Sequence, residues 1–501
     1  MSPLGIYVRV LVSVFFTSLL FVLSVFPIQC FDIFSYLTFG HQWFQSMSYN
    51  ATIIDANYLE SINIKHEWLS YSIFYNAFKF WGFKGVIVLK AVAVCLVGVV
   101  TSLFFWDRIF CFVMYQFLYS CSIIFSIYRI LSRSSLFSDL FLLLFLMLIA
   151  LFFSGRLSFI KALFYFGFLM LIWANLHPGF LIAIFIIWGI YFGIKFVYKT
   201  DFFMLEIKDY IFKIACLMTV VSFIHPLGIY SWRYTINFVI YKLPFFRIYI
   251  KEWAPGVVFL DNVYQFVFIG VGFFSCISLF LLYQLYRNRY TLPQRIRVLG
   301  VVFLGLFLMY LGLSFLSVRF FISWFLLQPF IVVYILMRLA RYNPKYQRLL
   351  KVDYKLIIFF CLFCICVSYF RITTFFIDNR RFGFGLDDRV LPVEFVMNHP
   401  KLDRPNLFSI HAYGGFFSFI YYGQKMFING FVTEKSLFES YYNVIEYKSD
   451  EIVNSFFDNY DINTVVLPIR DLKLFNYLNK SPNWKKFYTD KAVIGYHRVA
   501  N

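Results

Sequence analysis

Charged residues are scarce in this sequence: they make up 14% of its 501 residues, whereas hydrophobic residues make up 61%. The mean hydropathy is +0.73. Soluble domains rarely reach this balance, and uncharged runs of about 20 residues are typical of transmembrane helices. The composition therefore excludes an ordinary soluble protein and predicts a polytopic membrane protein.

Acidic residues are the scarcer of the two signs, with 26 Asp and Glu against 45 Lys and Arg and a net charge of +19. In a soluble protein such an excess would suggest nucleic acid as a partner. Here the basic residues cluster in short loops between apolar runs, as the positive-inside rule expects. We therefore expect contacts with anionic lipid headgroups and no nucleic-acid partner.

Several common catalytic and structural signatures are absent. The sequence contains no GxGxxG or P-loop motif, so soluble nucleotides are not predicted ligands. Ser70 stands where the second histidine of an HExxH zinc motif would follow His66 and Glu67, which argues against a metalloprotease. The pair Asp387-Asp388 is not a DxD motif. The nine cysteines lie mostly in apolar runs and none follows residue 370, so neither a disulfide framework nor a metal site is predicted.

Apolar runs of sufficient length predict eleven transmembrane helices. They lie near residues 8–30, 85–105, 110–127, 135–154, 159–174, 179–198, 211–227, 263–285, 298–314, 320–338 and 355–370. The first run is long and lacks a convincing cleavage site, so it is interpreted as a span and not as a signal peptide. The loops richest in Lys and Arg fall on one side, which the positive-inside rule makes cytoplasmic. The N-terminus is then cytoplasmic, and the loops 31–84 and 228–262 and the C-terminal region are extracytoplasmic.

Two domains are predicted: a transmembrane module, residues 1–370, and an extracytoplasmic domain, residues 371–501. In the first loop, apolar residues at helical spacing predict helices over Asp32–Phe44 and Trp68–Trp81 that lie in the membrane interface. The C-terminal region alternates helix-like and strand-like segments, which predicts a small α/β domain. Its predicted helices are 391–398, 450–459 and 471–480, and its predicted strands are 406–410, 425–428, 464–468, 485–488 and 492–497.

Short polar stretches stand at the ends of the apolar runs, and the predicted topology puts all of them on the extracytoplasmic side. They are residues 31–33, 66–69, 132–135, 175–179, 225–228, 251–253 and 317–319, and they combine acids, histidines and arginines with Trp, Pro and Gly. A protein that only anchors itself in the membrane does not require these residue types, whereas an enzyme that acts at the membrane surface does.

Asp32 directly follows the first span. It is either the cap of a helix or a general base at the membrane surface, and its position favours neither. Asp55, Glu60 and Glu67 in the same loop add carboxylates, one of which could orient an acceptor or hold a divalent cation.

Arginines at extracytoplasmic span ends run against the positive-inside bias, so each requires a local reason. A bound lipid phosphate is one reason, because the guanidinium fork matches phosphate oxygens; snorkelling to headgroups is the other. These arginines are Arg133, Arg233, Arg247 and Arg319. His177 and His225 each precede a proline, either in a re-entrant turn or as catalytic groups. Lys251-Glu252-Trp253 is either an interfacial ion pair and anchor or a substrate contact.

The order of these stretches resembles that of a known family. An Asp after the first span is followed by HEWLS (66–70), an Arg-containing break, an Asn-x-His-x-Gly turn, a Pro-x-Gly turn, a Glu-Trp loop and an Arg near the start of a late span. A domain with a Gly-Gly turn (414–415) and an Ile-x-Gly strand (428–430) comes last. This order is similar to that of bacterial polytopic proteins of the GT-C glycosyltransferase superfamily, whose relatives include protein O-mannosyltransferases and lipid A aminoarabinose transferases.

The resemblance implies a polyprenyl-phosphate or polyprenyl-diphosphate sugar donor, a glycan, lipid or protein acceptor, and transfer with inversion at the extracytoplasmic face of a bacterial inner (plasma) membrane. It implies Asp32 as the base, with Asp55 or Glu67 as a second acid, and Arg133, Arg319 and Arg247 as ligands of the donor phosphate. His66, Trp68, His177, His225, Glu252 and Trp253 are the expected substrate-binding residues. No cofactor is certain, and a divalent cation is possible.

Two positions depart from the family's pattern. His225 stands where Asn is expected before Pro-x-Gly, and Asn429 stands where similar chains often carry Asp before Gly430. The second departure argues against catalysis by the C-terminal domain and for acceptor recognition or structural support. Two other classes compete with the transferase: a transporter or flippase for a lipid-linked sugar, which would predict internal repeats and polar residues inside the spans, and a non-catalytic assembly factor.

Overall fold

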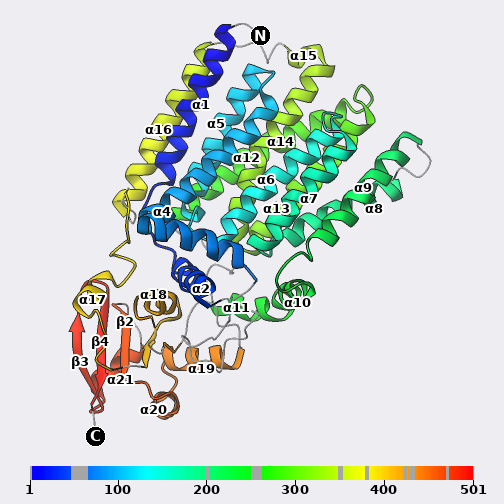
Figure 1. Cartoon of the computed structure of the whole chain (residues 1–501). Coiled ribbons are helices and arrows are strands. Elements are labelled where there is room, and N and C mark those ends of the chain that lie inside the picture. The colour runs from blue at the N-terminus through cyan, green and yellow to red at the C-terminus, as the bar shows by residue number, and fades with distance from the viewer. Residues whose placement is uncertain are drawn as a thin grey trace. The chain divides into compact units, whose positions relative to one another are not determined.

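The computed structural model describes residues 3–46, 66–197, 202–249, 262–347, 354–378, 383–404, 406–422, 426–427, 435–469 and 473–499 (Figure 1). The chain divides into two compact units, each of which gathers separate stretches of sequence. Unit 1 comprises residues 1–26, 88–235 and 246–380, and unit 2 comprises residues 27–87, 236–245 and 381–501.

Unit 1 is a bundle of apolar helices. They are α1 (Pro3–Ser24), the second part of α4 (Trp68–Ser102), α5 (Ile109–Ser126), α6 (Ser134–Phe153), α7 (Phe159–Leu176), α8 (Phe180–Val197), α9 (Phe202–Val221), α12 (Asn262–Arg287), α13 (Gln294–Leu316), α14 (Phe321–Tyr342) and α16 (Tyr354–Asp378). The short helices α10 (Ile229–Asn237), α11 (Leu243–Tyr249) and α15 (Pro344–Gln347) lie between them in sequence. Each predicted span overlaps one of the long helices.

Eight helices in the described part of the chain are long and apolar enough to cross a membrane, and Phe180–Phe196 and Ile357–Cys366 are shorter apolar helices. The predicted span 211–227 overlaps α9, which carries the charged residues Glu206, Lys208, Asp209 and Lys213. The chain is thus a polytopic α-helical membrane protein, as the composition predicted.

The centre of unit 1 is α14. In this helix 94% of the membrane-spanning window is buried inside the protein, more than in any other candidate span of the described chain. It packs against α5, α6, α12 and α13. Aromatic rings fill these contacts: the ring centroid of Phe330 lies 5.2 Å from that of Phe104, and that of Trp324 lies 6.0 Å from that of Phe307. Such rings bury large areas and favour tilted or edge-to-face packing.

In unit 2, the two predicted helices of the first loop are present. One is α2 (Asp32–Ser46), and the other is the first part of α4, which begins at Trp68. The helix breaks at Trp81 and Gly82, where Gly82 has φ 59° and ψ −150°. A glycine accepts this conformation without the steric cost that a Cβ would bring. The break therefore lies where the predicted interfacial helix ends, just before the predicted span begins.

The C-terminal part of unit 2 is the predicted α/β domain. Its described strands β1 (Leu407–Ser409), β2 (Thr464–Pro468), β3 (Trp484–Thr489) and β4 (Val493–Arg498) form a sheet of order β1-β2-β4-β3, with β1 and β2 parallel and the other pairs antiparallel. The helices are α17 (Val393–Asn398), α18 (His411–Ile420), α19 (Lys435–Ile445), α20 (Asp450–Asn459) and α21 (Lys473–Lys480). The strand expected at 425–428 is reduced to a bridge between Met426 and Leu407 among the described residues.

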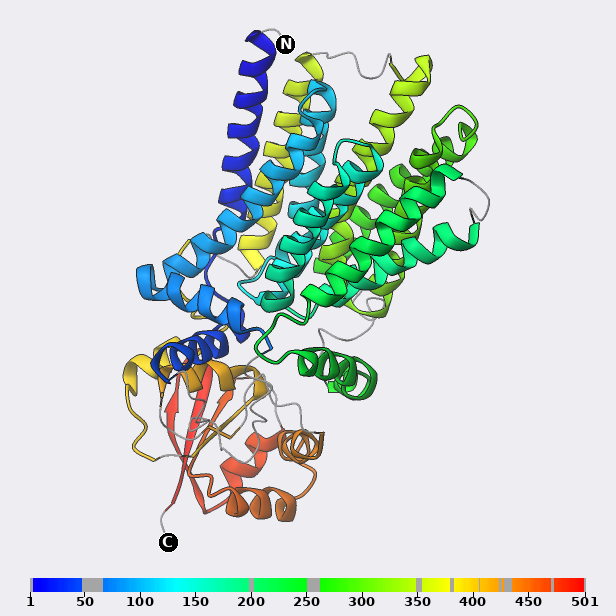
Figure 2. The ribbon, with the colours of Figure 1, turned by 45° about the vertical axis from the view of Figure 1, so that its right-hand side comes forward.

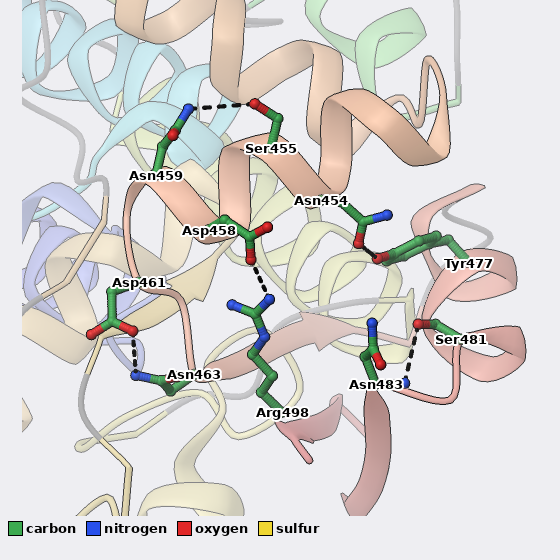
Figure 3. A network of polar contacts seen from close by, with 10 residues as sticks. All are labelled: Asn454, Ser455, Asp458, Asn459, Asp461, Asn463, Tyr477, Ser481, Asn483 and Arg498. Atoms are coloured by element: carbon green, nitrogen blue, oxygen red, sulfur yellow. Dashed lines mark hydrogen bonds and ion pairs between the residues drawn. The ribbon is translucent and has the colours of Figure 1, made fainter. Parts of the chain in front are cut away.

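Polar contacts tie α20 to the elements that follow it (Figure 3). Arg498 at the end of β4 forms an ion pair with Asp458 of α20, and the Tyr477 hydroxyl of α21 donates to Asn454. The side chain of Asn463 donates to Asp461 at 3.3 Å in the turn that leads into β2. The ion pair and the Asn463 contact are on exposed or partly exposed side chains, so each contributes about 1 kcal/mol or less.

Helix α18 packs directly on α2, and the two views of the fold show them side by side (Figures 1 and 2). The contact requires glycine at 415, because a Cβ there would lie 2.6 Å from Ser35 Oγ and 3.0 Å from the Phe31 carbonyl oxygen. The rings of Phe34 and Phe416 meet with centroids 4.9 Å apart. The C-terminal domain and the first-loop helix therefore belong to the same compact unit.

We predict that Gly415→Ala destabilises the protein, because the added methyl group has no space against the backbone of α2. Overpacking of this kind costs about 1–3 kcal/mol. A matched control is Gly189→Ala in α8, where an added Cβ meets no atom within 4 Å. The control should be neutral or stabilising by up to about 1 kcal/mol, since alanine favours the helix. Melting temperatures in detergent test this; equal shifts for the two variants would contradict the tight α2–α18 contact.

Candidate functional site

Unit 1 contains a polar cavity of about 60 Å³, measured as space for the centres of water molecules. It is lined by Arg129, Ser135, Ser138, Asp139, Leu142, Trp173, His177, Gly179, Ile182, Tyr310, Arg319, Phe320, Ile322 and Ser323. Arg129, Trp173 and Tyr310 are buried, whereas Asp139, His177 and Arg319 keep part of their surface exposed. The cavity is therefore lined by charged and hydrogen-bonding groups, some of which keep part of their surface exposed.

Three of the described helices begin at this cavity. Ser135 is the second residue of α6, Gly179 directly precedes α8, and Phe320 directly precedes α14. The first N–H groups of a helix have no partner inside the helix, and the N-terminus carries a partial positive charge of roughly half an elementary charge. Helix starts on the cavity wall therefore add a field that favours an anion.

Asp139 is the acid of the cavity. It lies one and a half turns into α6, and its carboxylate accepts a hydrogen bond from the Ser323 hydroxyl of α14. The guanidinium groups of Arg129, Arg319 and Arg133 lie within electrostatic range of this carboxylate. Arg129 closes the turn after α5 and Arg133 directly precedes α6, so the short α5–α6 connection supplies two of these arginines. A carboxylate in an apolar helix requires such partners, since an unpaired buried charge is costly.

A second set of polar residues in the cavity surrounds the Ser138 hydroxyl. The Trp173 indole N–H donates to Ser138 Oγ at 2.7 Å, and Ser138 Oγ lies 2.7 Å from His177 Nδ1. The Gly179 backbone N–H also donates to His177 Nδ1 at 3.0 Å. These donors assign Nδ1 as the acceptor, so the neutral imidazole carries its proton on Nε2. His177 therefore contributes a hydrogen-bond donor and not a base.

Asp32, the predicted base, is the first residue of α2 in unit 2. The partial positive charge at the N-terminus of the helix also stabilises a negative charge at this position. His411, the first residue of α18, lies within electrostatic range of Asp32. Burial lowers the pKa of His411 to about 4, and the Asp32 carboxylate opposes that shift. The backbone before Asp32 is held by Ile28, whose N–H donates to the Gly385 carbonyl at 2.8 Å. The C-terminal domain thus shapes the surroundings of Asp32.

His66 and Glu67 are both buried, with His66 Nε2 3.8 Å from Glu67 Oε1. Trp68 begins α4 next to them. These residues belong to unit 2, like Asp32, whereas Arg133, Arg319, Arg247, His177 and His225 belong to unit 1. The sequence-predicted residues therefore fall into two groups, and the structure brings His177 and Arg319 together at the cavity.

Two predicted residues make local structural contacts. Arg247 donates to the Leu316 carbonyl at 2.5 Å, which caps the C-terminal end of α13. His225 Nδ1 accepts from the Leu227 N–H at 3.0 Å in the Pro-x-Gly turn, where Gly228 has φ 52°. Neither residue lines the cavity.

Asp55, Glu252 and Trp253 lie outside the described residues. Within the described ranges, no group of three or more His, Cys, Asp or Glu side chains is arranged to hold a metal ion.

Six residues of the cavity wall were not predicted from the sequence: Asp139, Arg129, Ser138, Trp173, Tyr310 and Ser323. Several of them lie inside spans, whose interiors were expected to be plain apolar packing. Asp139 carries a signal that was available: it is an acid within a 20-residue apolar run. An ionisable residue inside a transmembrane helix is by default a functional candidate. Arg129, ten residues before it, is the nearest preceding basic residue outside the stretch 132–135.

We predict that Ser138→Ala destabilises the bundle by about 1–3 kcal/mol, because the Trp173 N–H, 1% exposed, loses its acceptor. The matched control is Ser314→Ala in α13, since Ser314 is also buried but donates to the Tyr310 carbonyl of its own helix at 2.7 Å. That carbonyl keeps its helical bond, so the control should cost less than about 1 kcal/mol. Thermal melts of both variants in detergent provide the comparison, and a control as costly as Ser138→Ala would refute the network.

We predict a pH-dependent contribution of His411 to stability. Its pKa is 6.5 in the unfolded chain and about 4 in the folded protein. The folded state then binds fewer protons, so this contribution is complete above pH 6.5 and is lost as the pH falls towards 4, by at most about 3 kcal/mol. His411→Gln should flatten the decline of the melting temperature over this range. If the melting temperatures of the variant and the wild type fall equally between pH 6.5 and 4, then His411 is not buried in its neutral form.

No protein-family model and no curated protein sequence matches the chain. Solved structures do. Archaeal oligosaccharyltransferase AglB from Archaeoglobus fulgidus, in complex with an inhibitory peptide and a dolichol-phosphate, aligns with TM-score 0.62 and 11% identity over 99% of this chain and 75% of that one. The oligosaccharyltransferase of the same organism in complex with Zn and sulfate aligns with TM-score 0.58 and 11% identity over 97% and 73%.

ArnT from Cupriavidus metallidurans, bound to undecaprenyl phosphate, aligns with TM-score 0.54 and 10% identity over 99% of this chain and 98% of that one. These proteins are GT-C glycosyltransferases. Identities this low establish the fold and not the activity. The chain has the same fold as the archaeal oligosaccharyltransferase and ArnT, which agrees with the fold that the resemblance implied.

Proposed function

We propose that this protein is a membrane glycosyltransferase. It moves a sugar from a polyprenyl-phosphate-linked donor to an envelope glycan, lipid or protein acceptor on the extracytoplasmic face of a bacterial inner membrane, with inversion. The observation that carries the proposal is the cationic cavity of unit 1, in a chain with the fold of enzymes solved with dolichol-phosphate and undecaprenyl phosphate.

In this proposal the cavity binds the donor phosphate. Arg319 and Arg129 line it, and Arg133 lies within electrostatic range of the same carboxylate, Asp139. Guanidinium groups suit phosphate because their N–H donors match its oxygens in pairs. The His177 Nε2–H is a further donor on the same wall. As the bond between the sugar and the phosphate breaks, negative charge grows on the phosphate, and fixed cations stabilise that charge in the transition state.

Asp32 is the proposed base. The acceptor oxygen attacks the anomeric carbon of the sugar while its proton passes to the Asp32 carboxylate. The bond from the anomeric carbon to the phosphate oxygen breaks on the opposite side, and its electron pair leaves with the lipid phosphate. One displacement of this kind inverts the anomeric carbon. A carboxylate positioned as a general base contributes about 100-fold to 10,000-fold in rate.

The remaining predicted residues have supporting roles in the proposal. Glu67 or Asp55 is the second acid, and His66, Trp68, His177, His225, Glu252 and Trp253 contact the substrates. Arg247 stays a proposed phosphate ligand, although its guanidinium also caps α13. The C-terminal domain recognises the acceptor or supports the first loop. A divalent cation remains compatible with the carboxylates of that loop, and one oligosaccharyltransferase with this fold was solved with Zn.

We predict that Asp32→Asn lowers the rate of sugar transfer by about 100-fold or more, because the general base is lost. Arg319→Gln should also abolish transfer, because the donor phosphate loses a cation. Deletion of the gene in the source organism is complemented with the wild type, each variant, or the control Asp209→Asn. Asp209 forms an exposed ion pair with Lys213 at 2.6 Å, which is worth about 1 kcal/mol at most. Mass spectrometry of envelope glycans and lipids then identifies the lost sugar, after immunoblots confirm equal membrane levels.

The outcomes separate the competing functions. Loss of the same sugar in the deletion strain and in both site variants, with the control intact, supports the transferase. Loss in the deletion strain but normal transfer with Asp32→Asn removes Asp32 as the base. If Arg319→Gln is also normal, the transporter and assembly-factor functions replace the transferase.

A further inference from the structure

A histidine of the C-terminal domain lies beside the proposed base. Resting on the proposed function, we infer that His411 binds the acceptor group from which Asp32 takes the proton. The imidazole ring and the carboxylate then bond to the same group, and a hydroxyl is suited to both because it donates one hydrogen bond and accepts others. In this role the C-terminal domain contributes a residue that touches a substrate, in addition to any supporting contacts.

Helices α2 and α18 of unit 2 begin together and run in the same direction. The contacts between them advance in step along both segments. Near their starts, the ring centroids of Phe31 and Tyr413 lie 5.7 Å apart, and about ten residues later those of His41 and Tyr422 lie 5.1 Å apart. Figures 1 and 2 show the two helices side by side. The first residues of the two helices therefore lie at the same end of the pair.

These first residues are Asp32 and His411. Their side chains lie within electrostatic range of each other. The close approach of the two helix starts depends on Gly415, one turn after His411, where a Cβ would lie 3.0 Å from the Phe31 carbonyl oxygen. The fold thus brings a residue of the C-terminal domain to the proposed base through a rigid helix contact and not through a loop.

The protein orients His411 through its backbone and through one ring contact. The His411 backbone N–H donates to the Tyr441 hydroxyl at 2.6 Å, and the Phe438 ring packs edge-to-face with ring centroids 5.2 Å apart. Within the described part of the chain, no group forms a hydrogen bond with either ring nitrogen, and the residue keeps part of its surface exposed. The ring is therefore held in place while its two nitrogens can serve a ligand.

Most other histidines of the chain use a ring nitrogen within the protein. Five of the seven bond or pair a ring nitrogen with a described group: His41, His66, His177, His225 and His399. The ring of His497 stacks on that of Phe487 with centroids 3.7 Å apart. Contacts of these kinds explain a histidine by the needs of the fold alone. They do not account for the ring nitrogens of His411.

The charge state of the ring agrees with this role. Burial lowers the pKa of His411 to about 4, although the Asp32 carboxylate opposes the shift, so the ring is neutral at pH 7. A neutral imidazole has one N–H donor and one lone-pair acceptor. A charged imidazolium beside Asp32 would stabilise the carboxylate and make it a weaker base. The neutral ring instead holds the acceptor and leaves the negative charge of Asp32 to attract the proton.

The experiment compares His411→Met with His411→Gln, two side chains of similar length of which only glutamine donates hydrogen bonds. Each purified full-length variant is added to detergent-solubilised membranes of the deletion strain, which supply the donor and the unmodified acceptor. Mass spectrometry follows the sugar that the deletion strain lacks, and initial rates at limiting membrane give relative kcat/KM. His411→Met should lower kcat/KM about tenfold or more, as expected for one lost hydrogen bond, and His411→Gln about threefold or less.

Two controls exclude a purely structural effect. The melting temperatures of the two variants at neutral pH should agree with each other. His497→Met removes another partly buried histidine of the same domain, one that makes no described contact with α2, and should transfer like the wild type. If His411→Met does not fold, His411→Phe replaces it, because phenylalanine keeps a ring against Phe438 and has no ring nitrogen.

The failures are distinguishable. If Asp32→Asn is inactive but His411→Met transfers like the wild type, this inference is overturned while the proposed base stands. Equal losses in His411→Met and His411→Gln, with normal melting temperatures, also overturn it, because hydrogen bonding at this position then has no effect. If Asp32→Asn transfers normally in the same assay, the proposed base fails and this inference fails with it. If the wild-type protein restores no sugar, the proposed function itself is wrong.

Discussion

A carboxylate placed inside an apolar helix must be balanced, because an isolated charge in a low-dielectric interior costs several kcal/mol. Asp139 imposes this requirement on unit 1. Its partners come from segments far apart in sequence: Arg129 and Arg133 from the α5–α6 connection, Arg319 from the turn before α14, and Ser323 from α14 itself. The carboxylate is thereby held among charged and hydrogen-bonding partners inside a bundle that consists largely of apolar side chains.

The ends of the helices follow from a related constraint. Backbone N–H and C=O groups at helix termini need hydrogen-bond partners inside a membrane. Polar side chains at the ends of spans therefore often bond to the backbone and not to a ligand. Arg247 caps α13, His225 holds the Pro-x-Gly turn, and the Gly179 N–H bonds to the His177 ring. Arg319 differs from Arg247 in that its position before α14 puts it on the cavity wall. Arginines near the ends of spans thus have different roles, which can be told apart by the groups that each arginine contacts.

Much of the fold was predictable because bilayer thickness sets the length of an apolar run directly. The start of α2 at Asp32 and the break near Trp81 also followed from local patterns. Helix α18 did not: Gly414 and Gly415 predict a turn locally, yet Gly415 serves a close approach to α2 that depends on tertiary contact. The joining of residues 27–87 with 381–501 in one unit was equally out of reach, since it depends on pairs such as Ile28 and Gly385. Among the residues that line the cavity, Arg319 and His177 were candidates from the sequence, whereas Asp139 was missed although an acid within a span is itself a signal.

Under the proposed function, in which the cavity binds the donor phosphate, the presence of Asp139 has a consequence for the reaction. A cavity lined by Arg129 and Arg319 with no acid would hold the donor strongly before any chemistry began. Asp139 lowers the attraction for the donor, a phosphodiester with one negative charge. It leaves enough positive charge to neutralise the second charge that appears as the sugar departs. Interactions that strengthen between the ground state and the transition state accelerate the chemical step, whereas uniformly strong binding does not. Under the proposed function, the same balance makes the lipid phosphate product, with its second negative charge, bind more tightly than the donor.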